Sequence, residues 1–323
     1  AGLLYIFGLL LLILVFIMGT DEGGSMEAKR WLVIGPVNFQ PSEVTKFTLV
    51  IYFAYRMERK SDEMKTFSGG ILTYGILLAP YAVCILLQPH ISGFVLICVI
   101  AASLIICGGA NKWWLISIAV VGIVGIAWFI NWQGGIEGSY VATRLKSWHD
   151  PFADVLNDTW QTAHSLIAIG SGGLFGLGFG NSRQKYLYLP EAQNDFIFPI
   201  VCEELGFIGA LAIILVFFLL IVEGYSIAAR CQDKFGMLIA VGFTTHIGIQ
   251  TIFNLAVVSN AIPNTGISLP FFSYGGTALI MQMAEMGIIM NISRKRYYPE
   301  KNDDETSDEA YEEAQQEELP KNA

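Results

Sequence analysis

The chain has 323 residues, of which 54% are hydrophobic and only 15% are charged. Soluble domains usually carry about 25% charged residues, so the composition excludes a soluble binding module. It predicts an all-α polytopic membrane protein. The formal net charge is −9, but residues 300–323 hold ten acids against two lysines, a net −8. The remaining residues 1–299, the predicted membrane domain, are nearly neutral and offer no basic patch for nucleic acid.

Eight apolar runs follow one another along the chain. All but the second approach the ~20 residues that a helix needs to cross a bilayer, so each is predicted to be one transmembrane helix. The runs occupy residues 3–19, 43–55, 69–87, 91–108, 113–131, 196–222, 236–258 and 274–292.

Basic residues predict the orientation of these spans. If the spans alternate, one side receives loop 56–65, Lys112, Arg230 with Lys234, and residues 294–296. The positive-inside rule makes that side cytoplasmic and places the acidic tail, which is too polar to fold alone and is predicted to be disordered, on the same side. The outer side receives residues 20–42, 88–90, 131–195 and 259–273.

The outer segment 131–195 is long for a connection, and such loops are usually functional or disordered. Residues 160–169 are amphipathic and predict a surface or re-entrant helix. Residues 170–180 contain six glycines, which favours close backbone approach or a re-entrant turn, with a flexible linker as the alternative. A nucleotide-binding loop is excluded, because no GK[ST] triplet and no preceding strand are present.

Acidic residues gather where this segment enters the sixth apolar run. Glu191 and Asp195 stand directly before the run, and Glu203 and Glu204 lie inside it. A carboxylate in a membrane helix is costly and usually functional. An acid at the mouth of such a helix can face water and a lipid-borne substrate together. We interpret Glu203 and Glu204, further along the helix, as structural or as lining a polar cavity.

A second outer cluster surrounds the start of the second apolar run. Pro41 suits the first turn of a helix, and Glu43 and Lys46, three residues apart, share one helix face. These two side chains form either a buried ion pair or a site at which Lys46, with Arg30, contacts an anionic lipid headgroup such as a pyrophosphate. Ser42 and Gln40 stand beside them as further candidate contacts.

Residues 260–276 are punctuated by proline and glycine and predict an irregular outer loop that lines a cavity. Ser273 and Tyr274 could donate hydrogen bonds there to a sugar or a peptide, and a structural role is equally consistent with the pattern. The four histidines lack the spacing of metal ligands, so no metal site is predicted from them.

These motifs, taken in order, resemble the shape, elongation, division and sporulation family, whose members are the FtsW, RodA and SpoVE proteins. The resemblance spans roughly residues 3–296 and is nearest to the FtsW and SpoVE side. It rests on a lead-in similar to RRW at Arg30, QPSE..K, the glycine-rich turn, YLPEAQNDFIF…EELGFIG and IP.TGI.LPF.SYGG. The family has ten spans with both termini cytoplasmic, so the first two spans are expected to be missing from this chain.

The resemblance implies a peptidoglycan glycosyltransferase that polymerises lipid II outside the bacterial cytoplasmic membrane during division, elongation or sporulation. A class B penicillin-binding protein would be its partner, with other membrane proteins of the division or elongation machinery. The family's essential acid maps onto Asp195, its QPSE..K lysine onto Lys46 with Glu43 and Ser42 beside it, and its arginine onto Arg30.

Three positions depart from the family pattern. Leu187 stands where many members have an acid, Asn264 stands where division-type members have a lysine, and His90 replaces the acid of a QPD motif. Any role of those family residues is therefore not expected here. Since Asp195, Lys46 and Arg30 are retained, we expect the chain to be active.

The expected mechanism follows from the leaving group, which is already good. Asp195 is predicted to act as the base on the acceptor hydroxyl, while Lys46 and Arg30 stabilise the departing pyrophosphate. The sequence leaves open whether a divalent cation, Mg²⁺ or Mn²⁺, assists them. Direct displacement would invert the donor's α linkage to β. Glu191 is expected to orient Asp195 or to raise its pKa as a like charge.

Two other classes of function stay open at this stage. A flippase or transporter of the same lipid precursor also uses intramembrane acids and broken helices, although no inverted repeat is obvious. A non-catalytic scaffold for a transpeptidase is the second alternative, and it predicts that Asp195→Ala still supports growth.

Overall fold

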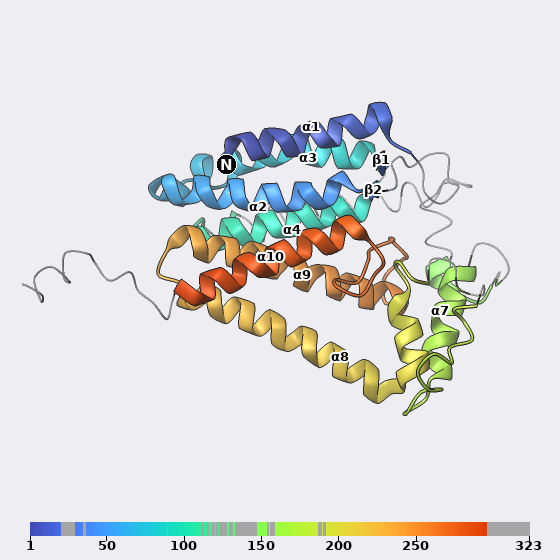
Figure 1. The fold of residues 1–323 in the computed structure, drawn as a ribbon. Helices are drawn as coiled ribbons and strands as arrows, with labels where there is room; N and C mark the ends of the chain where they lie inside the picture. Colours follow the sequence, from blue (N-terminus) through green and yellow to red (C-terminus); the bar gives the residue numbers. More distant parts are fainter. Residues whose placement is uncertain are drawn as a thin grey trace, which may run out of the picture.

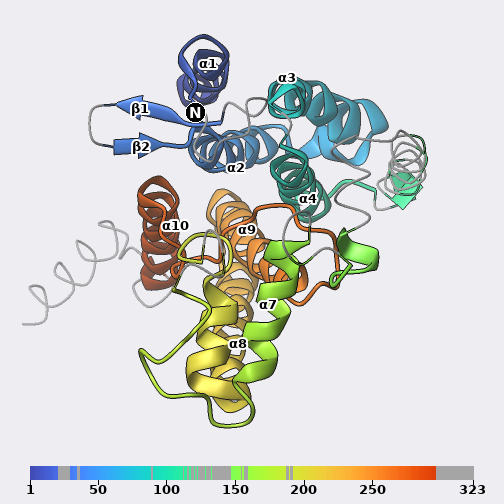
Figure 2. The same cartoon turned by 90° about the vertical axis from the view of Figure 1, so that its right-hand side faces the viewer.

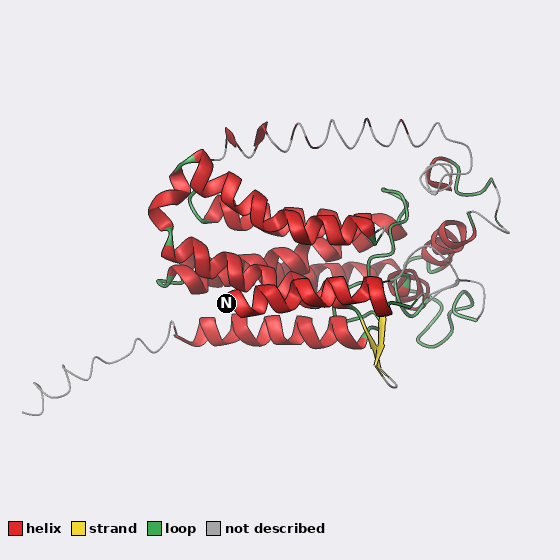
Figure 3. Cartoon of the chain, turned by 90° about the horizontal axis from the view of Figure 1, so that it is seen from above, coloured by secondary structure: helices red, strands yellow, loops and turns green. Residues whose placement is uncertain are grey.

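The computed structural model describes residues 1–20, 30–34, 37–88, 90–111, 147–153, 155, 159–186, 189 and 192–295, with single positions between 113 and 132. Helices dominate these residues, as the all-α prediction requires (Figure 3). The elements in chain order are α1 (Gly2–Met18), β1 (Leu32–Ile34), β2 (Val37–Phe39), α2 (Pro41–Arg59), a 3-10 turn (Ser61–Lys65), a π turn (Ser68–Leu72), α3 (Thr73–Leu87), α4 (Ile91–Cys107), α7 (Trp160–Ser171), α8 (Ile197–Arg230), α9 (Lys234–Val258) and α10 (Gly276–Lys295).

The long helices form a bundle around α9, which is buried along most of its length (Figure 1). Helix α9 packs against α2, α4, α8 and α10, whereas α1 covers the far side of α2 and α3 packs mainly against α4. Apolar side chains from α2, α4 and α9, among them Phe53, Leu104 and Phe243, interlock in the main core. The buried α9 is therefore the element from which polar side chains can reach several neighbouring helices.

The connecting segments collect at the two ends of the bundle as the charge pattern predicts. At one end, Lys234 Nζ donates to Ser61 Oγ at 2.6 Å and to the Gly108 carbonyl at 3.2 Å. At the other, Ser92 Oγ donates to the Thr265 carbonyl at 3.1 Å. We call these the inner and the outer end. The outer end carries the β1–β2 hairpin, α7 and residues 259–276 (Figure 1).

In the described part of the chain, each predicted span from 3–19 to 91–108 and from 196–222 to 274–292 falls on a helix, but the span 196–222 is broken at Gly206. Among the described residues, three helical stretches are long and apolar enough to cross a membrane, namely Ser68–Leu87, Ile197–Arg230 and Lys234–Val258, and two shorter apolar helices are Gly2–Met18 and Ile91–Cys107. The short second run is part of the 19-residue α2, which begins two residues earlier at Pro41 and continues beyond the run through the mostly charged residues 56–59. The run at 113–131 falls mostly, and the tail 300–323 wholly, outside the described residues.

Helix α8 is broken at Gly206, whose φ of 69° and ψ of −171° are not helical. The short arm, residues 197–205, runs beside α7 at the outer end, and the long arm, residues 207–230, runs back toward the inner end (Figures 1 and 2). The loop after α7 fits into the break. Leu177 N donates to the Glu203 carbonyl at 2.9 Å, and Phe207 N donates to the Gly173 carbonyl at 2.8 Å.

The glycines of this loop explain the contact. A Cβ on Gly176, whose φ is +79°, would lie 2.1 Å from the Glu204 carbonyl oxygen, closer than any side chain can approach. The close backbone approach predicted from the glycine density is thus present. The expected helix at 160–169 is α7.

Candidate functional site at the outer end of the bundle

The first turns of α2 hold a buried ion pair. Pro41 is at the start of the helix, as predicted, because its fixed φ suits the first turn and it lacks the N–H that would go unpaired there. One turn further, Lys46 Nζ lies 2.7 Å from Glu43 Oε1, and both side chains are almost fully buried. Glu43 Oε2 has no hydrogen-bond partner among the described residues. Of the two alternatives for these residues, the structure shows the buried ion pair, and one carboxylate oxygen is still available for a donor.

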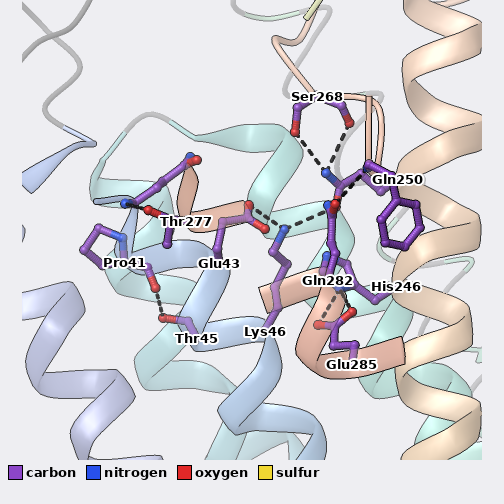
Figure 4. A network of polar contacts seen from close by, with 12 residues as sticks. Pro41, Glu43, Thr45, Lys46, His246, Gln250, Ser268, Thr277, Gln282 and Glu285 are labelled. Carbon is purple, nitrogen blue, oxygen red and sulfur yellow. Dashed lines mark hydrogen bonds and ion pairs between the residues drawn. The ribbon is translucent and has the colours of Figure 1, made fainter. Parts of the chain in front are cut away.

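Gln250 of α9 joins this pair to the outer loop (Figure 4). Lys46 Nζ donates to Gln250 Oε1 at 3.4 Å, and Gln250 Nε2 donates to the Ser268 carbonyl at 3.1 Å and to Ser268 Oγ at 3.0 Å. The amide therefore uses its acceptor on α2 and its donors on residues 259–276. This arrangement fixes the cation of Lys46 relative to the loop.

Asn254, one turn beyond Gln250 on the same face of α9, holds the predicted acid in place. Its Nδ2 donates to the Asp195 carbonyl at 2.8 Å and to the Ile267 carbonyl at 2.7 Å. Asp195 is half-buried just before α8, and a Cβ on Gly266 would lie 3.2 Å from its Oδ2. Gly266 has a φ of +66° and leaves room for the carboxylate. The backbone of Asp195 and the ammonium of Lys46 are therefore both held from one face of α9.

A second cation lies close to the Lys46 side of the site. Arg30 Nε donates to the Gln88 carbonyl at 3.4 Å, and the buried Gln88 side chain donates in turn to the Leu12 carbonyl at 3.1 Å. Burial of the neighbouring His90 imidazole, reinforced by the positive charges of Arg30 and Lys46, lowers the pKa of His90 to about 3. His90 is therefore neutral at neutral pH.

The remaining predicted contacts differ in how they are used. The Gln40 backbone N–H donates to Thr277 Oγ1 at 3.2 Å, and the Ser42 hydroxyl is buried with no hydrogen-bond partner among the described residues. Ser273 Oγ accepts from the Leu269 N–H at 2.6 Å, which is a turn-stabilising contact. Tyr274 is exposed. Glu191 lies outside the described residues.

Glu203 and Glu204 have a structural role, which is the first of the two interpretations offered by the sequence. Glu203 accepts hydrogen bonds from the Ser182 hydroxyl and from the backbone N–H of Arg183 at 3.0 Å. Glu204 accepts from the Gly180 N–H at 3.0 Å and pairs with Lys185 Nζ at 2.7 Å. Both carboxylates fasten the segment after the glycine-rich turn to the kink of α8.

Sequence reasoning missed the polar side chains inside the bundle. His246 Nδ1 donates to both oxygens of Glu285 at 2.9 and 3.0 Å, and both residues are buried. His246, Gln250 and Asn254 are four residues apart on an otherwise apolar helix, and that spacing places them on one face. Their regular spacing in the sequence would have predicted a polar face on this helix. In the part of the chain that the structure describes, no three His, Cys, Asp or Glu side chains come together to hold a metal ion.

The chain is similar in sequence to a known protein family. Residues 1–298 match the family described as "Cell cycle protein", which comprises FtsW, RodA and SpoVE. The probable peptidoglycan glycosyltransferase FtsW of Geobacter sulfurreducens is 37% identical over 288 residues, which cover 89% of this chain and 75% of that protein. Stage V sporulation protein E of Bacillus subtilis is 36% identical over 296 residues, covering 90% and 78%.

Solved structures have a similar fold. A chain of a peptidoglycan synthase complex, described in terms of the coordination of polymerization and crosslinking, matches with a TM-score of 0.73 at 25% identity, covering 91% of this chain and 81% of that one. The rod shape determining protein RodA of Thermus thermophilus matches with a TM-score of 0.64 at 27% identity, covering 91% and 77%.

Proposed function

This chain belongs to the cell-cycle protein family of FtsW, RodA and SpoVE, and from that membership we propose that it is a peptidoglycan glycosyltransferase. It polymerises lipid II into glycan strands at the outer face of the bacterial cytoplasmic membrane. The named relatives support this activity, since two thirds or more of their length is matched by this chain. The inner end, with its basic loops, faces the cytoplasm.

One observation carries the assignment of the site. The adjacent polar residues Gln250 and Asn254 of α9 tie the cation of Lys46 and the backbone of Asp195 to the same outer loop. A glycosyl transfer from a pyrophosphate needs a base for the acceptor and positive charge for the leaving group, held in fixed relation. In this chain Asp195, just before α8, is the base, and Lys46 of α2 supplies the positive charge. Both are held by hydrogen bonds with α9.

The reaction proposed for this site is a direct displacement. The acceptor hydroxyl oxygen forms a bond to the anomeric carbon of the donor sugar, and Asp195 takes the hydroxyl proton. The bond between the anomeric carbon and the phosphate oxygen breaks, and its electron pair leaves with the polyprenyl pyrophosphate. Lys46 and Arg30 stabilise the charge that develops there. The attack comes from the opposite face, so the α linkage of the donor becomes β in the product.

Other residues have supporting roles in this proposal. Glu43 holds the Lys46 ammonium in position, Ser42 and Gln40 line the start of α2, and Glu191 orients Asp195. Tyr274, which is exposed beside the loop, is a candidate donor to the sugar or peptide, as is Ser273 after rotation away from Leu269. Mg²⁺ or Mn²⁺ is a further candidate for neutralising the pyrophosphate.

The proposed partner is a class B penicillin-binding protein, which would crosslink the strands that this chain makes. The match to a chain of a peptidoglycan synthase complex supports such a pairing. Additional membrane proteins of the division or elongation machinery would assemble with the pair.

Incubation with fluorescent lipid II tests the proposed activity. The chain, purified with its class B partner, should give a ladder of glycan strands on a gel, and Asp195→Ala should give none. A flippase would instead move lipid II across vesicles and make no ladder. A scaffold would allow Asp195→Ala to support growth in cells that depend on this protein, and either result would overturn the proposal.

A further inference from the structure

The glycine-rich loop, defined as residues 172–180, presents apolar side chains to its surroundings. Phe175 and Phe179 are 80% and 88% exposed, and Leu174 is 61% exposed. Clusters of large apolar side chains that are exposed to this degree mark surfaces that contact another molecule or a membrane. The proposed reaction makes no use of this loop, which is fastened to α8 on the side away from Asp195.

The loop lies at the edge of the molecule. It wraps around the kink of α8, and seen from the outer end it is at the opposite side of the bundle from α1 (Figure 2). The first residues of the long arm, Phe207, Ile208 and Leu211, are exposed as well. The apolar surface of the loop is therefore continuous with the surface of α8 that faces lipid.

The length of the long arm places the loop at the boundary of the bilayer. Residues 207–230 are 24 helical residues, which extend about 36 Å at 1.5 Å per residue. The hydrocarbon core is about 30 Å thick. The predicted span ends at residue 222 and the next residue, Glu223, is charged and exposed, so the inner boundary lies near Glu223. The part of the arm from there to the kink extends about 24 Å, which leaves the kink and the loop at or just inside the outer boundary rather than in bulk water.

Hydrogen bonds to α8 and within the loop pair several of the loop's backbone groups. The N–H groups of Gly176 and Gly178 donate to the carbonyls of Gly172 and Glu204 at 2.8 and 3.1 Å. The Leu174 carbonyl accepts from the Ile208 N–H at 3.2 Å. These hydrogen bonds lower the cost of placing this irregular backbone at the edge of a membrane.

We propose that the glycine-rich loop inserts Leu174, Phe175 and Phe179 among the acyl chains of the outer leaflet, as an extension of the lipid-facing surface of α8. The bilayer is the partner that fits, since the loop is at the perimeter and its exposed apolar side chains continue the exposed apolar surface of α8. The short arm connects this anchor to Asp195. Provided that the proposed function holds, the anchor sets the depth of Asp195 relative to the headgroups that carry the substrate.

Photocrosslinking in the full chain tests the proposal without measuring activity. A photoreactive p-benzoyl-phenylalanine replaces Phe175 or Phe179, and the protein is placed in vesicles of phosphatidylethanolamine and phosphatidylglycerol. Ile208, on the lipid-facing surface of α8, is the positive control, and Asp62, exposed in the inner-end loop, is the negative control. After irradiation, mass spectrometry measures adducts on acyl chains.

Positions 175 and 179 are expected to give acyl-chain adducts at the level of position 208, and position 62 is expected to give background only. Background labelling at 175 and 179, with position 208 labelled on acyl chains, would overturn the proposal. So would adducts that go to the class B partner instead of lipid in the complex. Because all of the substituted side chains are exposed, a folding defect is not expected, and the elution profile of each variant on a sizing column checks this.

Discussion

Asn254 holds the backbone of Asp195 in place. Its amide holds two backbone carbonyls, those of Asp195 and Ile267, at 2.8 and 2.7 Å. Both carbonyls lose this donor in Asn254→Ala, at a cost of about 1–3 kcal/mol in the free energy of unfolding. Misplacement of Asp195 is expected to lower the rate of lipid II polymerisation roughly 100-fold.

Thr251→Val is the matched control for Asn254→Ala. Thr251 is buried on the same helix, and its hydroxyl donates only to the Ile247 carbonyl one turn back, at 2.8 Å. This variant should keep near-normal polymerisation at a similar thermal stability. If both variants lost activity to the same extent, the effect would be one of helix packing and not of positioning the acid.

Variants of the Lys46–Glu43 ion pair can distinguish an effect on stability from an effect on catalysis. Lys46→Met leaves the buried Glu43 carboxylate without its cation, so the variant should lose about 3–5 kcal/mol of stability. The double variant Lys46→Met, Glu43→Gln removes both charges and should recover most of that loss, as measured by thermal unfolding in detergent. Activity should stay absent in both, because the pyrophosphate lacks its cation. Recovery of polymerisation in the double variant would contradict the role of Lys46.

His90 predicts a dependence of stability on pH. Its pKa in the folded protein is about 3, below the ordinary value of about 6.5. The unfolded chain therefore binds a proton that the folded protein excludes as the pH falls from about 6.5 toward 3. The stability contributed by the neutral imidazole is complete above about pH 6.5 and decreases on acidification, by about 2 kcal/mol between pH 7 and pH 5.

Unfolding midpoints measured between pH 5 and pH 7 check this slope. The variant His90→Asn has no titrating group at the position, so its midpoint should change less on acidification than that of the parent. Equal slopes for the two proteins would show that the imidazole is not held neutral by burial and by its cationic neighbours.

At the scale of elements, the kink of α8 depends on Gly206. Its φ of 69° with ψ of −171° is a region almost confined to glycine, and a side chain there costs about 1–3 kcal/mol from the backbone alone. A Cβ would also lie 2.3 Å from the Gly176 nitrogen. Gly206→Ala should therefore release the loop from the kink and lower thermal stability.

Gly287→Ala in α10 is the control for the effect of adding a methyl group. A Cβ at Gly287 has no atom within 4 Å, so alanine in this helix should raise stability by about 0.5–1 kcal/mol. Limited proteolysis of residues 172–180 provides the local measurement, and cleavage should increase only in Gly206→Ala. Equal cleavage in the parent and in Gly206→Ala would argue against the kink as the seat of the loop.

The break in α8 could not be predicted from the sequence. The apolar run that contains Gly206 was predicted as one span, because a single glycine in such a run is compatible with a helix. The break is caused by a loop about thirty residues earlier in the chain, and local pattern carries no information about that docking. By contrast, the pairing of Glu43 with Lys46 and the start of α2 at Pro41 were predictable, since both depend on neighbours within one turn.

At the scale of the whole molecule, the bundle brings α2, α9 and the segment before α8 together at the outer end. The charge pattern predicted which loops share an end, and the contacts of Lys234 and Ser92 agree with it. Gln250 and Asn254 were not predicted, although they connect Lys46 to Asp195. Helix α9 is mostly apolar, so its sequence alone indicates only a buried helix. The partners of its polar residues are set by how α9 packs against other helices, which the local pattern does not specify.

The most direct test of the account is to measure binding and polymerisation of lipid II by Asp195→Asn. This change removes the base with little change of size and leaves the cations Lys46 and Arg30 intact. The account predicts that the variant, with its class B partner, binds fluorescent lipid II as tightly as the parent but makes no glycan ladder. A ladder of normal intensity from Asp195→Asn would contradict the assignment of Asp195 as the base.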